Sequence, residues 1–172
     1  RDSPADGHYC QTCTTGAVND NPTMGTCTAC PKGYYSTGTY AAFDPTARPT
    51  NGGTCVACGQ GRFGPAQMAS DEKSSCIKCP AGKKSNASVA TDASTCQDCN
   101  EQYRSSKGSA SCSLCPLGKF QKSKGSSNCL KCPSGYIQEV RGTGCTKCAI
   151  GYFTAEPESS GDACDACLPG FY

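Results

Sequence analysis

The chain has 172 residues, 18 of them cysteine, and a net charge of only +2. Cysteine at about one residue in ten indicates a disulfide scaffold, and the even number allows full pairing. The hydrophobic fraction of 36% includes these cysteines, and there is no tryptophan, so little material remains to offset backbone ordering at about 1–2 kcal/mol per residue. Disulfides must contribute to stability, which excludes a reducing cytosol.

No apolar run approaches the ~20 residues that a membrane-spanning helix needs, and no signal peptide opens the chain. We therefore expect a mature form or a fragment, with any membrane attachment made by regions outside this chain. The charge is uneven, because residues 73–131 carry ten basic and three acidic side chains. The middle of the chain is mildly basic.

Nine C-x-x-C doublets follow one another along the chain, and their starts lie 16 to 28 residues apart. Such a period indicates a repeat architecture, in which each repeat contacts only its neighbours. We expect one continuous array over residues 1–172, with an incomplete first and last repeat that suggest a fragment of a longer array. The repeats begin near residues 10, 27, 55, 76, 96, 112, 129, 145 and 164.

Each repeat predicts a turn, a short strand and a polar loop, in that order. Proline directly follows the second cysteine in four repeats, and glycine lies three residues after it in eight of nine. Proline fixes φ and glycine accepts positive φ, so this pair predicts a turn into a strand that starts at an aromatic residue, which we expect to cover a disulfide. Only Gln102 replaces the glycine, and the turn there is expected to differ. The predicted strands start near Tyr34, Phe63, Tyr103, Phe120, Tyr136, Tyr152 and Phe171.

The loops after these strands are rich in Ser, Gly and Lys, as in residues 104–109 and 122–127, and they are expected to form hairpin tips. No window shows sustained apolar spacing of three and four residues, so we expect no helices. The predicted fold is a small, disulfide-rich, irregular β structure, an elongated rod of tandem short hairpins.

The unit C-P-x-G-x-Y/F, with a loop closed by the next cysteine, resembles the cysteine-rich repeats of ephrin-receptor-like and tumour necrosis factor receptor-like ectodomains, which also occur in protist surface proteins. In those families the cysteine before the proline bonds to the first cysteine of the next doublet. The resemblance therefore implies a staggered ladder with the pairs Cys13–Cys27, Cys30–Cys55, Cys58–Cys76, Cys79–Cys96, Cys99–Cys112, Cys115–Cys129, Cys132–Cys145 and Cys148–Cys164.

That scheme leaves Cys10 and Cys167 for disulfides to a further repeat or to another subunit. A competing scheme joins the doublets two by two, first cysteine to first and second to second, and strands one of the nine doublets. Loops of 12 to 24 residues, as in the staggered scheme, contribute about 3 kcal/mol each in the chain-entropy treatment. Eight such cross-links could stabilise a chain with little core.

Two other functions of C-x-x-C doublets, zinc binding and thiol redox chemistry, have less support in this sequence. Zinc accepts thiolate pairs at this spacing, but the odd number of doublets, the Pro/Gly/aromatic pattern and a single histidine, His8, argue against a metal site. Thioredoxin-like redox chemistry needs a helix start after a strand. We find no paired carboxylates, phosphate loop or nucleophile motif, so we expect neither an enzyme nor a cofactor.

Three surface features suggest partners. The basic middle segment could bind an anionic glycan, although lysines also keep loops soluble and protect strand edges. Asn86 begins the one N-glycosylation sequon. The second loop, residues 37–54, is the longest and carries Tyr40 and Phe43 as candidate contacts.

The sequence thus predicts an extracellular or cell-surface glycoprotein without enzymatic activity. We expect a structural protein, such as a stalk, coat or filament component, whose partners are neighbouring repeats or subunits of the same protein. The other hypothesis is a receptor or adhesin ectodomain that binds a protein or glycan ligand. No nucleic-acid partner is expected.

Overall fold

A computed structural model describes residues 13, 16–18, 27–37, 53–154 and 163–171 of the chain. The chain divides into two compact bodies. The N-terminal body comprises Arg1–Ile77 and Ser88–Ala93, and the C-terminal body comprises Lys78–Ala87 and Ser94–Tyr172. The loop after Ala87 therefore packs with the repeats that precede it.

The described residues form short hairpins. In the N-terminal body the strands are β1 (Ala17–Val18), β2 (Thr28–Ala29), β3 (Tyr34–Ser36), β4 (Cys55–Ala57) and β5 (Arg62–Phe63), followed by β6 (Ile77–Lys78), which ends at the boundary. The C-terminal body contains β7 (Lys83–Lys84), β8 (Gln97–Asp98), β9 (Tyr103–Arg104), β10 (Ser113–Leu114), β11 (Lys119–Phe120), β12 (Leu130–Lys131), β13 (Tyr136–Ile137), β14 (Thr146–Lys147), β15 (Tyr152–Phe153) and β16 (Asp165–Ala166).

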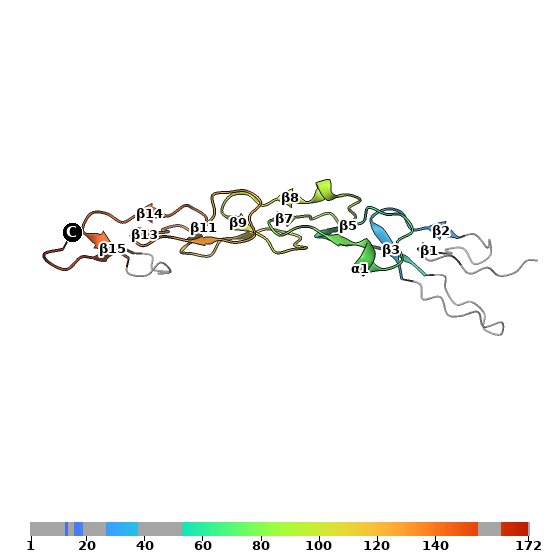
Figure 1. Cartoon of the computed structure of the whole chain (residues 1–172), viewed down its shortest axis with the longest axis horizontal. Helices are drawn as coiled ribbons and strands as arrows, with labels where there is room; N and C mark the ends of the chain where they lie inside the picture. Colours follow the sequence, from blue (N-terminus) through green and yellow to red (C-terminus); the bar gives the residue numbers. More distant parts are fainter. Residues whose placement is uncertain (1–12, 14–15, 19–26, 38–52, 155–162, 172) are drawn as a thin grey trace, which may run out of the picture. The chain divides into compact units, whose positions relative to one another are not determined.

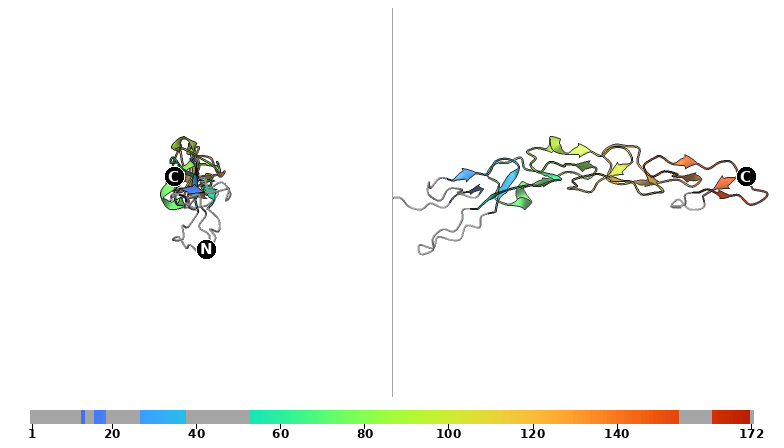
Figure 2. Two further views of the ribbon diagram at one scale, coloured as in Figure 1. Left: turned by 90° about the vertical axis from the view of Figure 1, so that its right-hand side faces the viewer. Right: turned by 180° about the vertical axis from the view of Figure 1, so that it is seen from behind.

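Every described strand pairs with a single neighbour in sequence, so each sheet has two strands. The pairs are antiparallel, as in β7–β8, where Lys83 lies opposite Asp98, and β11–β12, where Lys119 lies opposite Lys131. Figure 1 shows β7 beside β8 and β13 beside β14. The reverse view in Figure 2 shows the C-terminal body as the same succession of hairpins. Because isolated two-stranded hairpins are marginally stable, other contacts must hold them.

The predicted turn is present in each described repeat. The N–H of Tyr34 donates to the carbonyl of Pro31 at 3.2 Å, and the glycine between them, Gly33, has φ +84°. Gln102 adopts the same left-handed conformation, with φ +67°, and Tyr103 donates to Asn100 at 3.1 Å. The expectation of a different turn at Gln102 is therefore wrong, because the surrounding contacts impose the conformation on a residue that disfavours it.

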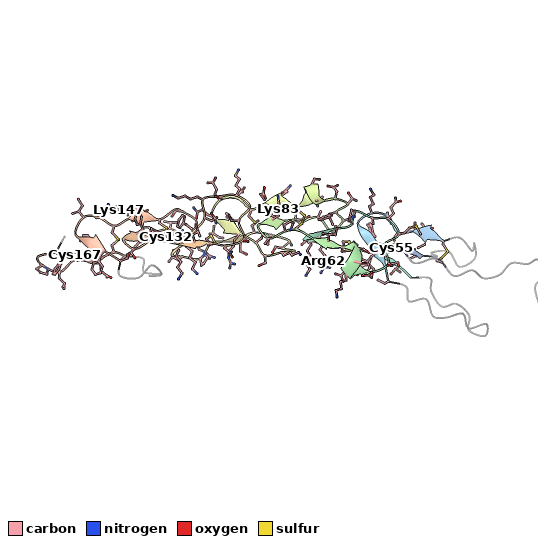
Figure 3. The ribbon with its side chains drawn as sticks, viewed as in Figure 1. Cys55, Arg62, Lys83, Cys132, Lys147 and Cys167 are labelled. Carbon is pink, nitrogen blue, oxygen red and sulfur yellow. A yellow bond between two sulfur atoms is a disulfide. The ribbon has the colours of Figure 1, made fainter. Side chains whose placement is uncertain are left out.

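Eight disulfides link the hairpins in a staggered ladder, with the same pairs that the resemblance implied: Cys13–Cys27, Cys30–Cys55, Cys58–Cys76, Cys79–Cys96, Cys99–Cys112, Cys115–Cys129, Cys132–Cys145 and Cys148–Cys164. Cysteines dominate the core, and the second cysteines Cys30, Cys79, Cys99 and Cys115 are fully buried. Figure 3 shows the sulfurs along the ribbon while most side chains point outward. The predicted disulfide-rich, irregular β class is confirmed.

The aromatic residues at the strand starts are partly exposed, as Tyr103 is to 38% and Tyr152 to 50%, and their role as a cover for the disulfides stays a prediction. The position three residues after the turn glycine, or after Gln102, is buried, and it carries a small or polar residue: Ser36, Gly64, Ser85, Ser105, Gln121, Gln138 and Thr154. Besides sulfur, the interior thus holds small and polar side chains. Those of Ser105 and Gln121 donate hydrogen bonds, whereas the buried hydroxyls of Ser36 and Ser85 have no hydrogen-bond partner among the described residues.

A short helix also occurs, contrary to expectation. It is α1 (Glu72–Ser75), with the 3₁₀ turn Ala93–Thr95 at the equivalent place in the next loop. The Asp71 carboxylate caps α1, accepting from the N–H of Ser74 at 2.8 Å and from its hydroxyl. A helix of four residues is below the length at which apolar periodicity can be recognised.

Candidate functional site

The feature that the repeats have in common is a set of backbone hydrogen bonds at the cysteines. In seven of the described hairpins the N–H of the second cysteine donates to the carbonyl of the turn residue of the preceding repeat, as in Cys99 to Gly82 and Cys115 to Gln102, both 2.8 Å. These bonds close the hairpin beside the disulfide. Each of these hairpins is thus held both by a disulfide and by a backbone hydrogen bond.

The carbonyl of the second cysteine is used as well. It accepts an N–H from the loop of the following repeat: Gly108 donates to Cys79 at 2.9 Å and Gly125 to Cys99 at 2.8 Å. In a later repeat the Nε of Arg141 donates to Cys115 at 3.1 Å and replaces the backbone donor. Each loop therefore lies back against the repeat that precedes it.

Contacts also extend over two repeats. A Cβ placed on the turn glycine Gly82 would lie 1.9 Å from the carbonyl oxygen of Gly125, which belongs to the second loop further on. A Cβ placed on Gly16 would likewise lie 1.7 Å from the carbonyl oxygen of Met68. Glycine is required at these turns both by positive φ and by the close approach of a backbone. Three consecutive repeats thus interlock.

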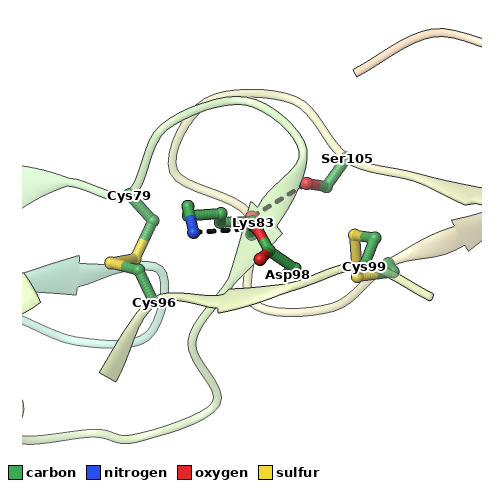
Figure 4. Close-up of polar contacts among 7 residues, drawn as sticks. Cys79, Lys83, Cys96, Asp98, Cys99 and Ser105 are labelled. Carbon is green, nitrogen blue, oxygen red and sulfur yellow. Dashed lines mark hydrogen bonds and ion pairs between the residues drawn. A yellow bond between two sulfur atoms is a disulfide. The ribbon is translucent and has the colours of Figure 1, made fainter. Parts of the chain in front are cut away.

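The side chains of β7–β8 show how one hairpin is fastened (Figure 4). Lys83 and Asp98 lie opposite each other, and Nζ and Oδ1 are 2.8 Å apart. The hydroxyl of the buried Ser105 donates to the carbonyl of Lys83 at 2.8 Å. Both partners of the ion pair are more than a third exposed, so it contributes at most about 1 kcal/mol, and the contact from Ser105 joins the next repeat.

The candidate site residues predicted from the sequence lie apart from one another or outside the described residues. Asn86 is exposed just after β7, and its glycosylation stays a prediction. Cys167 is half-buried and has no disulfide, whereas Cys10 and His8 lie outside the described residues. Tyr40 and Phe43 also lie outside them. The second loop, residues 37–54, is closed at its base, where Thr37 donates to the carbonyl of Thr54 at 3.1 Å.

In the part of the chain that the structure describes, no three His, Cys, Asp or Glu residues are placed to hold a metal ion. Asp71 stands out among the described acids, because hydrogen bonds from the side chain and backbone of Ser74 lower its pKa, and this is a helix cap. Nor is any described helix long and apolar enough to cross a membrane.

Comparison with known proteins gives one family match. Residues 102–144 match the family described as tyrosine-protein kinase ephrin type A/B receptor-like. No curated protein matches the chain. The match covers about a quarter of the chain and contains β9 to β13, within the C-terminal body.

The match confirms that this chain contains a cysteine-rich module similar to those of ephrin-type receptors. Modules of this kind are normally not enzymes, and together with the disulfide ladder they indicate an extracellular or cell-surface location. The buried polar position and the hydrogen bonds at the cysteines were not predicted. Their only trace in the sequence is the recurrence of Ser, Gln or Thr three residues after the turn glycine.

Proposed function

We propose that the chain is an extracellular structural component, a segment of a stalk, coat or filament, and not an enzyme. The observation that carries this proposal is the interlocking of three consecutive repeats, by a disulfide, by the hydrogen bonds of the cysteine backbone and by the close approach at the turn glycine. Such an array transmits tension through covalent bonds at every repeat. It also leaves no long loop without an anchor in the described C-terminal repeats.

The character of the interior supports this role. Stability comes from sulfur, backbone hydrogen bonds and small polar side chains, so it depends little on the hydrophobic core that a globular enzyme needs. The surface loops vary in sequence between repeats, while the cysteines, turn residues and buried polar positions recur. Each repeat therefore has the same structural role in the array.

A receptor or adhesin ectodomain is the second candidate. The family match over residues 102–144 supports it, because that family is named after receptors. Exposed apolar side chains, such as Leu130, Val140 and Tyr152 in the C-terminal body, would then belong to a ligand-binding face. The two candidates predict different arrangements of the protein on its native surface.

Immunogold electron microscopy of native material, with an antibody against this chain and preimmune serum as the control, separates the candidates. Label that repeats along continuous fibres or over a coat supports the structural role. Label on separate membrane-tethered particles would contradict it and favour the receptor. The expected result does not depend on knowing a ligand.

A further inference from the structure

The repeats of the C-terminal body contain a site that a single loop residue covers. The N–H of Cys99 donates to the carbonyl of Gly82 at 2.8 Å, which places a cysteine beside the turn of the preceding repeat. Gly125 lies on both residues, because its N–H donates to the carbonyl of Cys99 at 2.8 Å and its carbonyl oxygen lies 1.9 Å from where a Cβ on Gly82 would be. Gly82 and Cys99 are both buried. We call such a turn residue and its hydrogen-bonded cysteine a turn–cysteine seat.

The N-terminal body contains the same seat. The N–H of Cys30 donates to the carbonyl of Gly16 at 3.0 Å, and the N–H of Met68 donates to the carbonyl of Cys30 at 3.0 Å. The carbonyl oxygen of Met68 lies 1.7 Å from where a Cβ on Gly16 would be. Met68 and Gly125 both have positive φ, +57° and +70°. The seat therefore binds the backbone of a loop residue in the left-handed conformation, which glycine adopts most easily.

Two further seats in the C-terminal body have no such cover among the described residues. The N–H of Cys148 donates to Gly135 at 2.8 Å, and that of Cys167 donates to Gly151 at 2.7 Å, so both seats are formed. A Cβ on either glycine would meet none of the described residues within 4 Å, and no described N–H donates to the carbonyl of either cysteine. All four residues are half-buried, whereas their counterparts at the covered seats are buried. Both seats are therefore open.

Apolar side chains border the second of these open seats. Ile150 directly precedes its glycine and Leu168 directly follows its cysteine, so the hydrogen bond between glycine and cysteine brings the two residues to one place. Ile150 is 97%, Leu168 72% and Phe171 73% exposed. At the covered seat of the same body, Ala81 and Asn100 stand where Ile150 and Leu168 stand here. Clustered exposed apolar side chains are typical of a protein interaction surface.

From these observations we propose that the two open seats bind loops of a second copy of this chain. The contact would continue the one already made between repeats, in which a left-handed loop residue donates its N–H to the cysteine carbonyl and covers the turn glycine. The apolar side chains around the second seat would be buried in the same contact. The inference rests on the proposed structural role and names a partner for it.

A second copy fits because the chain itself carries loops of the kind that the seats bind. At the two covered seats described above, the loop belongs to the repeat that follows the two repeats forming the seat. With the second copy continuing the series of doublets, the same offset gives the open seats the segments before its Cys10 and Cys27, which contain Gly7 and Gly25. Seats and segments are different surfaces of one chain, so the association is head-to-tail and extends into a filament instead of closing as a dimer.

Sedimentation velocity of the oxidised chain, from about 1 μM to 1 mM, tests the proposal. We expect the weight-average sedimentation coefficient to rise with concentration and to fall again on dilution, which excludes disulfides between copies. In Gly151→Ala the added Cβ stands where the bound loop residue has to lie, as the geometry at Gly82 shows, so the dissociation constant should rise at least about tenfold.

The matched control for this variant is Gly59→Ala. Gly59 has the same left-handed backbone as Gly151, with φ +77° against +83°, and a Cβ on either residue would meet none of the described residues within 4 Å. The two variants therefore share the cost of a left-handed alanine and differ in the seat. Gly59→Ala should associate within about twofold of the parent.

A second pair of variants tests the apolar border without changing the backbone. Ile150→Asp with Leu168→Asp places two charges in the contact and should abolish association. Leu130→Asp with Val140→Asp adds the same charge to side chains of the same body that are 56% and 62% exposed, and association should stay within about twofold of the parent. All four positions are exposed, so denaturant unfolding should give the parent midpoint in both double variants.

A parent chain that stays monomeric over the whole range would overturn the proposal. This outcome includes the case in which another protein occupies the seats in place of a second copy. Equal weakening in Gly151→Ala and Gly59→Ala would overturn it as well, and so would association that persists in Ile150→Asp, Leu168→Asp. The structural role is tested separately by electron microscopy, since label along fibres together with a chain that does not associate with itself would refute this inference alone.

Discussion

Substitution of two equivalent turn glycines tests whether repeats interlock over two steps. Gly82 and Gly135 have similar positive φ, +85° and +79°. A Cβ on Gly82 would lie 1.9 Å from the backbone oxygen of Gly125, whereas a Cβ on Gly135 would meet none of the described residues within 4 Å. Gly82→Ala and Gly135→Ala therefore share the cost of left-handed backbone and differ in the steric conflict.

The left-handed conformation costs alanine about 1–2 kcal/mol in either variant. In Gly82→Ala the backbones at residues 82 and 125 must also move apart. This displacement breaks one hydrogen bond on each side of the contact, from the N–H of Gly125 to Cys99 and from the N–H of Gly82 to Ser105. At about 1 kcal/mol for each bond, the local cost rises to roughly 3–4 kcal/mol. The two variants should thus differ by about 2 kcal/mol.

Hydrogen exchange followed by mass spectrometry measures this difference directly. A loss of about 2 kcal/mol accelerates amide exchange about thirtyfold, so the peptide that contains Gly125 should exchange faster by that factor in Gly82→Ala. In Gly135→Ala the same peptide should exchange at the parent rate. Equal acceleration in both variants would refute the claim that the turn of one repeat seats a loop two repeats away.

Three further predictions follow from single contacts. Gln102→Gly should change the free energy of unfolding by less than about 1 kcal/mol, because it relieves a left-handed non-glycine residue but removes the hydrogen bond that the N–H of Gln121 donates to Gln102 Oε1 at 3.2 Å; denaturant unfolding that shows a larger loss would contradict this. Replacing Cys79 and Cys96 together by serine should cost about 3 kcal/mol in the same assay, and an unchanged midpoint would contradict the role of the ladder. Hydrogen bonding to Ser74 lowers the pKa of Asp71. The α1 cap should therefore be fully formed above the ordinary aspartate pKa near 3.9 and lost as the pH falls through the lower pKa of the folded state. An NMR titration of the Ser74 amide with a midpoint at or above the ordinary aspartate pKa would count against it.

The sequence allowed the ladder and the turns to be predicted because covalent and conformational constraints are local. The cysteine spacing defines where cross-links can form, and glycine at the turn, as at Gly33, reports positive φ. The pairing itself came from resemblance to a family. The residue Gln102 shows the limit, since its conformation is imposed by neighbours that no local pattern reveals.

The buried polar position could not be predicted for a related reason. Ser105 and Gln121 have the hydropathy of loop residues, but both are buried and hydrogen-bonded to the preceding repeat, at Lys83 and Gln102 respectively. Which loop covers which strand depends on long-range packing, as in the contact of Gly82 with Gly125.

Contour length under tension tests the central claim that the array is a tether of fixed length. The eight disulfide loops enclose about 130 of the roughly 150 residue steps between Cys13 and Cys164. With each Cα pair 5.3–5.9 Å apart across its disulfide, the oxidised segment can extend to about 120 Å, against about 500 Å when reduced.

In an optical-tweezers experiment on the whole chain, the oxidised protein should therefore stop extending at about 120 Å between those cysteines. Addition of a reductant should lengthen it in steps of roughly 40–80 Å, one for each disulfide. An oxidised segment that extends beyond about 250 Å, as doublets joined two by two would allow, would contradict the account.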